Sequence, residues 1–177
     1  MSLIINAAHF AAAAHGEQRR KYSETPYIWH PARVAGRVAL LPNATEEMIA
    51  AAYLHDVLED TPTTVFKLEE LFGSKVTKMV IDLTNVSKGS TKPRAERKKM
   101  DFEYLSSTPP EIKQIKLLDR IDNLREMQGA PDKFGRLYCQ ESRDLSAAIG
   151  LVDTQLNGEL LVEIYRLEKS LESQGKG

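Results

Sequence analysis

The chain has 177 residues, of which 42% are apolar and 28% charged, and 24 Lys and Arg nearly balance 25 Asp and Glu. This composition is typical of one soluble domain and argues against a general nucleic-acid binder. No apolar run approaches the roughly 18 residues of a membrane-spanning helix, and no secretion signal is visible. The single Cys139 excludes an internal disulfide and a thiolate-rich metal site, so we expect a cytoplasmic protein without membrane or nucleic-acid partners.

The pattern is helical along nearly the whole chain. Pro31 suits the first turn of a helix, and Thr45 followed by two glutamates is typical of an N-cap with an acidic first turn. No segment alternates with period two, so the sequence predicts an all-α fold, in a single domain over residues 1–172 with a frayed tail over 173–177. The predicted helices cover residues 3–15, 31–41, 46–58, 66–72, 75–86, 94–105 and 111–127, with one or two more within 133–173.

Four ionisable side chains gather at the end of an apolar helix. Nine of the eleven residues in 48–58 (MIAAAYLHDVL) are apolar, which predicts a helix buried on most sides. His55 and Asp56 lie near its end, and Glu59 and Asp60 follow each of them at i+4. A buried carboxylate needs a partner, which a divalent metal or a cationic side chain can supply. A solvated acidic helix end is the plain alternative, although acids there oppose the helix dipole.

A second carboxylate lies on the inward stripe of the helix predicted over 111–127. Asp119 shares that stripe with Ile112, Ile115 and Asp122, and Asn123 lies beside it at i+4. The plain alternative to a metal ligand is a buried ion pair, for which Arg120 and Arg125 are the nearby cations.

His30 stands where a loop meets a helix, so its imidazole can project into a cleft. With His55, Asp56 and Asp119 it makes two imidazoles and two carboxylates from three helices. Such a set suits Mn²⁺, Fe²⁺ or Zn²⁺ better than Ca²⁺ or Mg²⁺, which prefer oxygen ligands alone. The set leaves coordination positions open for water and substrate, as catalysis requires.

The order H…HD…D resembles the HD-domain metal-dependent phosphohydrolases. Four flanking words resemble more closely the hydrolase domain of the Rel/Spo stringent-response enzymes, and the length resembles their stand-alone small alarmone hydrolases. These words are RRK at 19–21, TPYIWHP at 25–31, LHDVLEDT at 54–61 and KLLDRIDNL at 116–124. The resemblance covers about residues 5–130 well and the C-terminal helices poorly.

The resemblance implies about ten helices around one Mn²⁺, held by His30, His55, Asp56 and Asp119. It implies that Glu59 and Asp60 serve the attacking water in acid/base work, in removing the 3′-diphosphate of ppGpp or pppGpp to give GDP or GTP and pyrophosphate. The positions that match the family's nucleotide and phosphate contacts are Arg20, Lys21 and Asn123. Tyr138 and Arg143 are suggested for base and ribose contacts, where the resemblance is weak.

Two alternatives remain open on the sequence. Trp29, which precedes the motif histidine, and the unmatched C-terminal third allow an HD phosphohydrolase for another nucleotide, such as the 2′-phosphate of NADPH or a nucleoside monophosphate. A non-catalytic nucleotide-sensing module is the other. The sequence does not determine the oligomeric state, the native metal or the preference between ppGpp and pppGpp.

Overall fold

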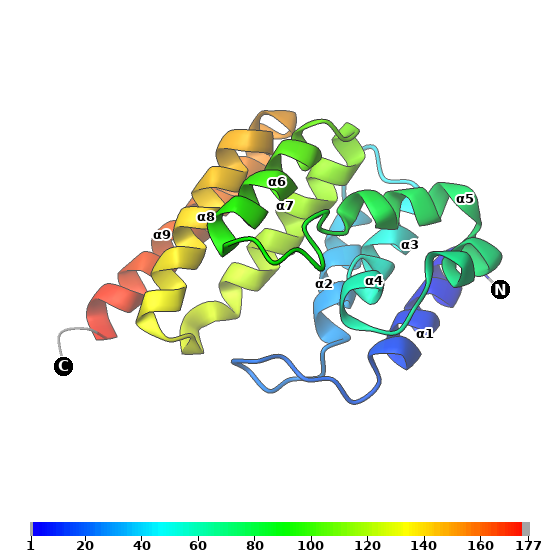
Figure 1. Ribbon diagram of the computed structural model, residues 1–177, viewed down its shortest axis with the longest axis horizontal. Coiled ribbons are helices and arrows are strands. Elements are labelled where there is room, and N and C mark those ends of the chain that lie inside the picture. The colour runs from blue at the N-terminus through cyan, green and yellow to red at the C-terminus, as the bar shows by residue number, and fades with distance from the viewer. Residues whose placement is uncertain (1, 175–177) are drawn as a thin grey trace. The chain divides into compact units, whose positions relative to one another are not determined.

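The computed structural model describes residues 2–174, except for the side chains of residues 128 and 174 (Figure 1). Within that range the regular structure is helical apart from an isolated bridge between Arg19 and Pro26, which confirms the all-α prediction. No helix in residues 2–174 has both the length and the hydrophobicity to cross a membrane. The helices are α1 (Leu3–His15), α2 (Trp29–Val38), α3 (Glu46–Leu54), α4 (Val57–Asp60), α5 (Val65–Leu83), α6 (Arg94–Ser106), α7 (Pro110–Arg125), α8 (Asp132–Ile149) and α9 (Thr154–Gln174), with 3₁₀ turns at Met127–Gly129 and Gly150–Val152.

The described residues form two compact units. The first comprises residues 2–20 and 25–91, and the second comprises residues 21–24 and 92–174. In the first unit α3 is the central element, because α1, α2 and α5 all pack against it. Its alanines and Leu54 are fully buried, and Thr45 caps it by accepting a hydrogen bond from the backbone N–H of Met48 at 3.2 Å. The predicted cap and the buried apolar helix are thus confirmed.

The helix predicted over 46–58 is in fact broken at the His-Asp pair. α3 ends at Leu54, and α4 begins at Val57. Asp56 between them has φ −100° and ψ −7°, in the sparsely populated bridge region. The His55 ring lies 2.7 Å from the Ala52 carbonyl oxygen through Nδ1, so its side chain bonds the last turn of α3. The continuous apolar run hides this break, since the hydrophobic pattern does not change across it.

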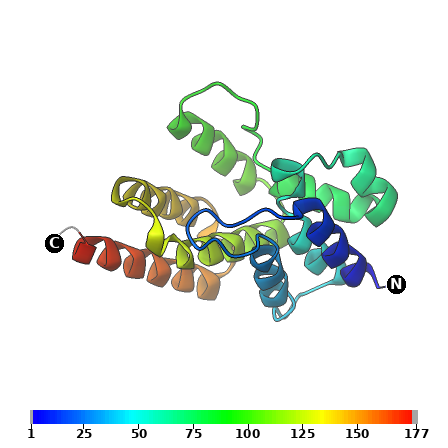
Figure 2. The same cartoon turned by 90° about the horizontal axis from the view of Figure 1, so that it is seen from below.

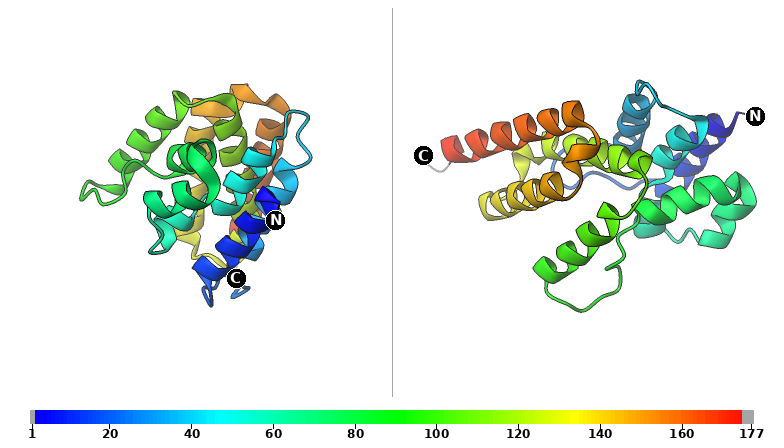
Figure 3. Two further views of the ribbon diagram at one scale, coloured as in Figure 1. Left: turned by 90° about the vertical axis from the view of Figure 1, so that its right-hand side faces the viewer. Right: turned by 90° about the horizontal axis from the view of Figure 1, so that it is seen from above.

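The break expected between 66–72 and 75–86 is confirmed, because α5 consists of two helical segments that meet at a kink (Figure 3). Gly73 has φ 76° and ψ 169°, a conformation that residues with a Cβ rarely adopt. The helix then continues to Leu83, three residues before the predicted end.

In the second unit α9 packs against α7 and α8, and α6 packs against α8. α8 and α9 lie side by side in Figure 2, so the uncertain count over 133–173 resolves into two helices. At Gly135 the Leu171 side chain of α9 packs directly on α8, because a Cβ there would lie 2.8 Å from Leu171 Cδ1. α9 continues to Gln174, although the sequence predicts fraying from Ser173; residues 175–177 lie outside the described residues.

Candidate metal centre

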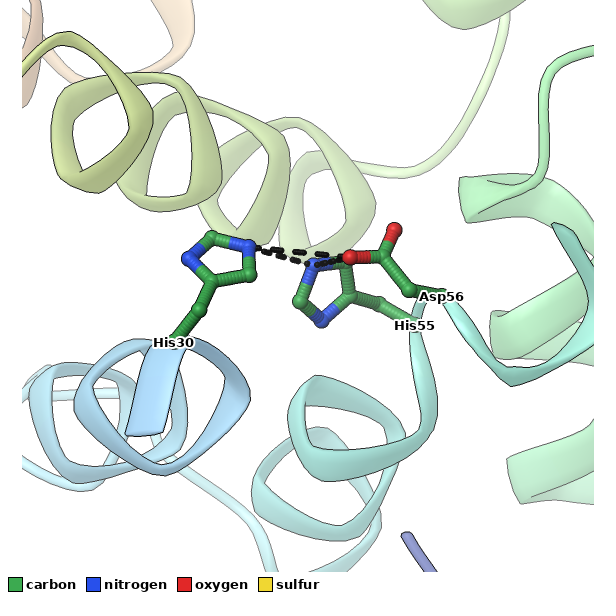
Figure 4. Close-up of side chains that lie close together, drawn as sticks. All are labelled: His30, His55 and Asp56. Carbon is green, nitrogen blue, oxygen red and sulfur yellow. Dashed lines mark hydrogen bonds and ion pairs between the residues drawn. The ribbon is translucent and has the colours of Figure 1, made fainter. Parts of the chain in front are cut away.

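Three of the four predicted metal ligands meet at one point of the first unit (Figure 4). His30 comes from α2, and His55 and Asp56 come from the break between α3 and α4; both imidazoles are buried, with 0% and 1% of their surface exposed. Their Nε2 atoms are 3.2 Å apart. Asp56 Oδ2 lies 3.1 Å from His55 Nε2 and 3.6 Å from His30 Nε2. One oxygen and two nitrogens therefore face a common centre.

The protonation pattern of this cluster fits a divalent cation. The contact of His55 Nδ1 with the Ala52 carbonyl places a proton on Nδ1, so in the neutral ring Nε2 is the nitrogen that carries the lone pair. Two Nε2 atoms 3.2 Å apart cannot both carry protons without steric and electrostatic conflict. Two imidazole nitrogens and one carboxylate oxygen are the donor set of Mn²⁺, Fe²⁺ and Zn²⁺ sites.

Asp119, the fourth predicted ligand, belongs to α7 in the second unit. Its predicted burial is confirmed, with 5% of the residue exposed. It accepts a hydrogen bond from Asn123 Nδ2 at 2.5 Å and pairs with Lys116 Nζ at 2.9 Å. The neighbouring cation is thus Lys116, one turn earlier on the same helix, whereas Arg125 binds Glu159 and Glu163. The role of Asp119 as a metal ligand stays a prediction.

Asn85 holds Glu59 in a fixed orientation. The backbone N–H of Asn85 donates to Glu59 Oε1 at 2.7 Å, and the Asn85 side-chain amide donates to Oε2 at 2.8 Å. Both carboxylate oxygens therefore have an N–H donor, from a residue 26 positions later in the chain. No pattern in the sequence indicates this pairing, because it depends on how the end of α5 returns to α4.

Asp60 and Asp56 share one hydroxyl group. Tyr27 donates to Asp56 Oδ2 at 2.6 Å and contacts Asp60 Oδ2 at 2.9 Å. Burial, followed by the nearby charges of Asp56 and Asp60, raises the pKa of Tyr27 above its ordinary value, so the phenol is neutral and keeps its donor hydrogen. Tyr27 belongs to the TPYIWHP word, and its place three residues before His30 was the available signal.

The predicted substrate contacts fall in both units. The Arg20 guanidinium lies over the Tyr27 ring at 5.4 Å, in the first unit. In the second unit, Lys21 Nζ lies 5.4 Å from the centre of the Tyr22 ring, and Arg120 lies 4.3 Å from that of Tyr138. Arg143 pairs with Glu168 of α9 at 2.7 Å. These residues, together with Asn123, stay predictions as substrate contacts.

Comparisons with known proteins identify the family of this chain. Residues 7–150 match the family described as HD domain. "Guanosine-3′,5′-bis(diphosphate) 3′-pyrophosphohydrolase MESH1" of Homo sapiens is 40% identical over 149 residues, which cover 82% of this chain and 82% of that protein. The "Guanosine-3′,5′-bis(diphosphate) 3′-pyrophosphohydrolase" of Aquifex aeolicus is 35% identical over 146 residues, 82% of this chain but only 21% of the longer relative.

A solved structure shows the same similarity in three dimensions. It is described as a metazoan ortholog of SpoT that hydrolyses ppGpp and plays a role in starvation responses. It matches with a TM-score of 0.83 and 30% identity, over 95% of this chain and 96% of its own. The resemblance inferred from the H…HD…D order and its flanking words is confirmed, and the chain belongs to the HD-domain family.

Proposed function

We propose that this chain removes the 3′-diphosphate of ppGpp and pppGpp in a metal-dependent hydrolysis, giving pyrophosphate and GDP or GTP. The observation that carries the proposal is the convergence of two buried imidazoles and the Asp56 carboxylate, with Glu59 and Asp60 on the helix that follows directly. The names of the human and bacterial relatives support the same reaction.

His30, His55 and Asp56 would hold the cation, with Asp119 as the proposed fourth ligand. We propose Mn²⁺, with Fe²⁺ or Zn²⁺ as the alternatives that the same nitrogen and oxygen donors accept. When bound, a divalent cation supplies Lewis acidity, which makes water more acidic and offsets phosphate charge.

The protein's own carboxylates would move the protons. In the proposed reaction water attacks the phosphorus attached to O3′, the O3′–P bond breaks, and O3′ receives a proton. Glu59, oriented by Asn85, takes the proton from the attacking water. Asp60 beside it orients that water, receives the proton from Glu59 and delivers it to O3′ as the O3′–P bond breaks. Carboxylates in fixed positions contribute about 10²–10⁴-fold to rate in such roles.

The cations and aromatic groups would bind the nucleotide. Arg20 and Lys21 are proposed to hold phosphate oxygens, and Asn123, Tyr138 and Arg143 to contact the nucleotide. Guanidinium groups suit phosphate because they donate two parallel hydrogen bonds. The proposed location is the cytoplasm, and the single cysteine of the chain supports a reducing compartment.

A product assay tests the proposal: purified protein, Mn²⁺ and ppGpp, read by ³¹P NMR, with an EDTA control. We expect GDP and pyrophosphate, with the activity abolished by EDTA. Intact ppGpp in a protein that binds Mn²⁺ would remove the alarmone assignment. Intact ppGpp together with no bound Mn²⁺ would favour a non-catalytic module.

Glu59→Gln separates the chemistry from metal binding. The amide keeps the size of the side chain but cannot take a proton, so we expect Mn²⁺ affinity to be retained and turnover to fall roughly 10²-fold or more. Calorimetry with Mn²⁺ and initial rates with ppGpp measure the two quantities. Full turnover by the variant would show that Glu59 is not the base.

One observation favours a second substrate. Trp29, next to His30 at the start of α2, leaves 53% of its surface exposed, although a tryptophan buries a large apolar area when it is in a core. An exposed indole offers a stacking surface to a base or a nicotinamide, so NADPH with its 2′-phosphate is the alternative nucleotide. Values of kcat/KM for ppGpp and NADPH, measured side by side, distinguish the two substrates. A preference of about tenfold for NADPH, some 1.4 kcal/mol, would overturn the alarmone assignment.

A further inference from the structure

One hydroxyl group of the first unit links the candidate metal centre to a candidate acid/base residue. Tyr27 Oη lies 2.6 Å from Asp56 Oδ2 and 2.9 Å from Asp60 Oδ2. The Asp56 oxygen is the same atom that faces the two histidine nitrogens. The hydroxyl has one hydrogen and lies within hydrogen-bond distance of both carboxylates, so Tyr27 bridges these two oxygens.

The Tyr27 ring is fixed from several sides. His15, at the end of α1, stacks on it with ring centres 4.5 Å apart and planes at 28°. The His30 ring meets it edge-on at 6.0 Å, and the Arg20 guanidinium lies 5.4 Å from its centre. Gln18 completes the arrangement, since it contacts His15 Nδ1 at 2.9 Å and donates to the Asp60 carbonyl at 2.8 Å. A ring with such neighbours cannot turn its hydroxyl away without disturbing α1.

We propose that Tyr27 is a positioning residue that holds the metal-facing oxygen of Asp56 toward His30 and His55, and at the same time fixes Asp60 for proton transfer. Its effect on the reaction rests on the proposed function; its effect on metal binding does not. Hydrogen-bond partners of metal ligands orient them, and their removal typically costs about 10–100-fold in metal affinity or activity.

Tyr27→Phe tests the proposal, because it removes the hydroxyl and keeps the stacked ring. The matched control is Tyr165→Phe, at an exposed tyrosine of α9 in the second unit. We expect both variants to fold, as judged by circular dichroism and thermal melting without metal. We expect Tyr27→Phe to bind Mn²⁺ about tenfold more weakly than the control, measured by calorimetry without substrate. Equal Mn²⁺ affinity in the two variants would overturn the proposal.

Kinetics at saturating Mn²⁺ test the link to Asp60. We expect kcat of Tyr27→Phe for ppGpp to fall about tenfold while KM stays within about threefold, because the substrate contacts are untouched. Asp60→Asn and the double variant complete a double-mutant cycle. We expect Tyr27→Phe to lower kcat little further when it is added to Asp60→Asn. Additive losses would overturn the link. If the wild-type chain leaves ppGpp intact, the proposed function fails, and Mn²⁺ affinity alone decides on Tyr27.

Discussion

Asn85 provides both hydrogen bonds that fix Glu59, so its side chain tests how far the orientation of that carboxylate matters. Asn85→Ala leaves the backbone donor to Oε1 and removes the amide donor to Oε2. We expect kcat to fall roughly tenfold with KM little changed, because a small displacement of a catalytic group is costly. Asn6→Ala, at an exposed asparagine of α1, is the control for the measured rates. Equal rates in the two variants would mean that Glu59 needs no support from Asn85.

Two buried aspartates of the second unit allow the role of Asp119 to be separated from plain structural pairing. Asp119 pairs with Lys116, and Asp101 pairs with Lys98, each at i,i+3 and each with about the same exposure. Both Asp→Asn variants leave a partly buried lysine without its carboxylate, so we expect both to lower the melting temperature. Only Asp119→Asn should also weaken Mn²⁺ binding, by roughly tenfold or more. A matching loss of Mn²⁺ affinity in Asp101→Asn would point to a general effect of instability.

At the scale of single elements, the bend of α5 depends on the backbone freedom of Gly73. A Cβ there would meet no atom within 4 Å, so only its φ of 76° opposes a side chain. We expect Gly73→Ala to reduce the free energy of unfolding by about 1–3 kcal/mol. Gly36→Ala is the matched variant, at an exposed position inside α2 with ordinary helical φ and equally open space. It should increase that free energy by about 0.5–1 kcal/mol. Urea unfolding measures both changes in the free energy of unfolding. Changes of the same sign in the two variants would show that the φ of Gly73 does not oppose a side chain.

The elements also show which features a sequence can predict. The Thr45 cap and the break at Gly73 are local, because a hydroxyl or a missing Cβ acts within a few residues. The break between α3 and α4 is not, since the apolar pattern of the sequence continues across it. The order H…HD…D predicted the convergence of His30, His55 and Asp56. The contacts of Asn85 and Tyr27 with the carboxylates, made across 26 to 33 positions, required the structure.

For the whole molecule, the fit of the metal centre predicts a stability that depends on the ion. At a free Mn²⁺ concentration 100 times Kd, binding adds about 2.7 kcal/mol to the free energy of unfolding. For a chain of this size we expect Tm to rise roughly 5–10 °C. The same concentration of Ca²⁺ should raise Tm less, because two of the three ligand atoms are imidazole nitrogens. Differential scanning fluorimetry with EDTA reversal measures the shift, and an undiminished shift in His55→Ala would place the ion elsewhere.

Cys139, the one cysteine of the chain, can report local opening of the second unit through its reaction with alkylating reagents. Cys139 lies on α8 with 1% of its surface exposed, its Sγ is 3.9 Å from the Ile164 carbonyl of α9, and burial raises its pKa to about 11. Alkylating reagents attack the thiolate, so near neutral pH the closed pair of helices leaves almost nothing for them to modify. Alkylation of Cys139 therefore requires α8 and α9 to separate far enough to expose the thiol. The rate of labelling, followed by mass spectrometry without any introduced probe, counts these openings in the unaltered protein.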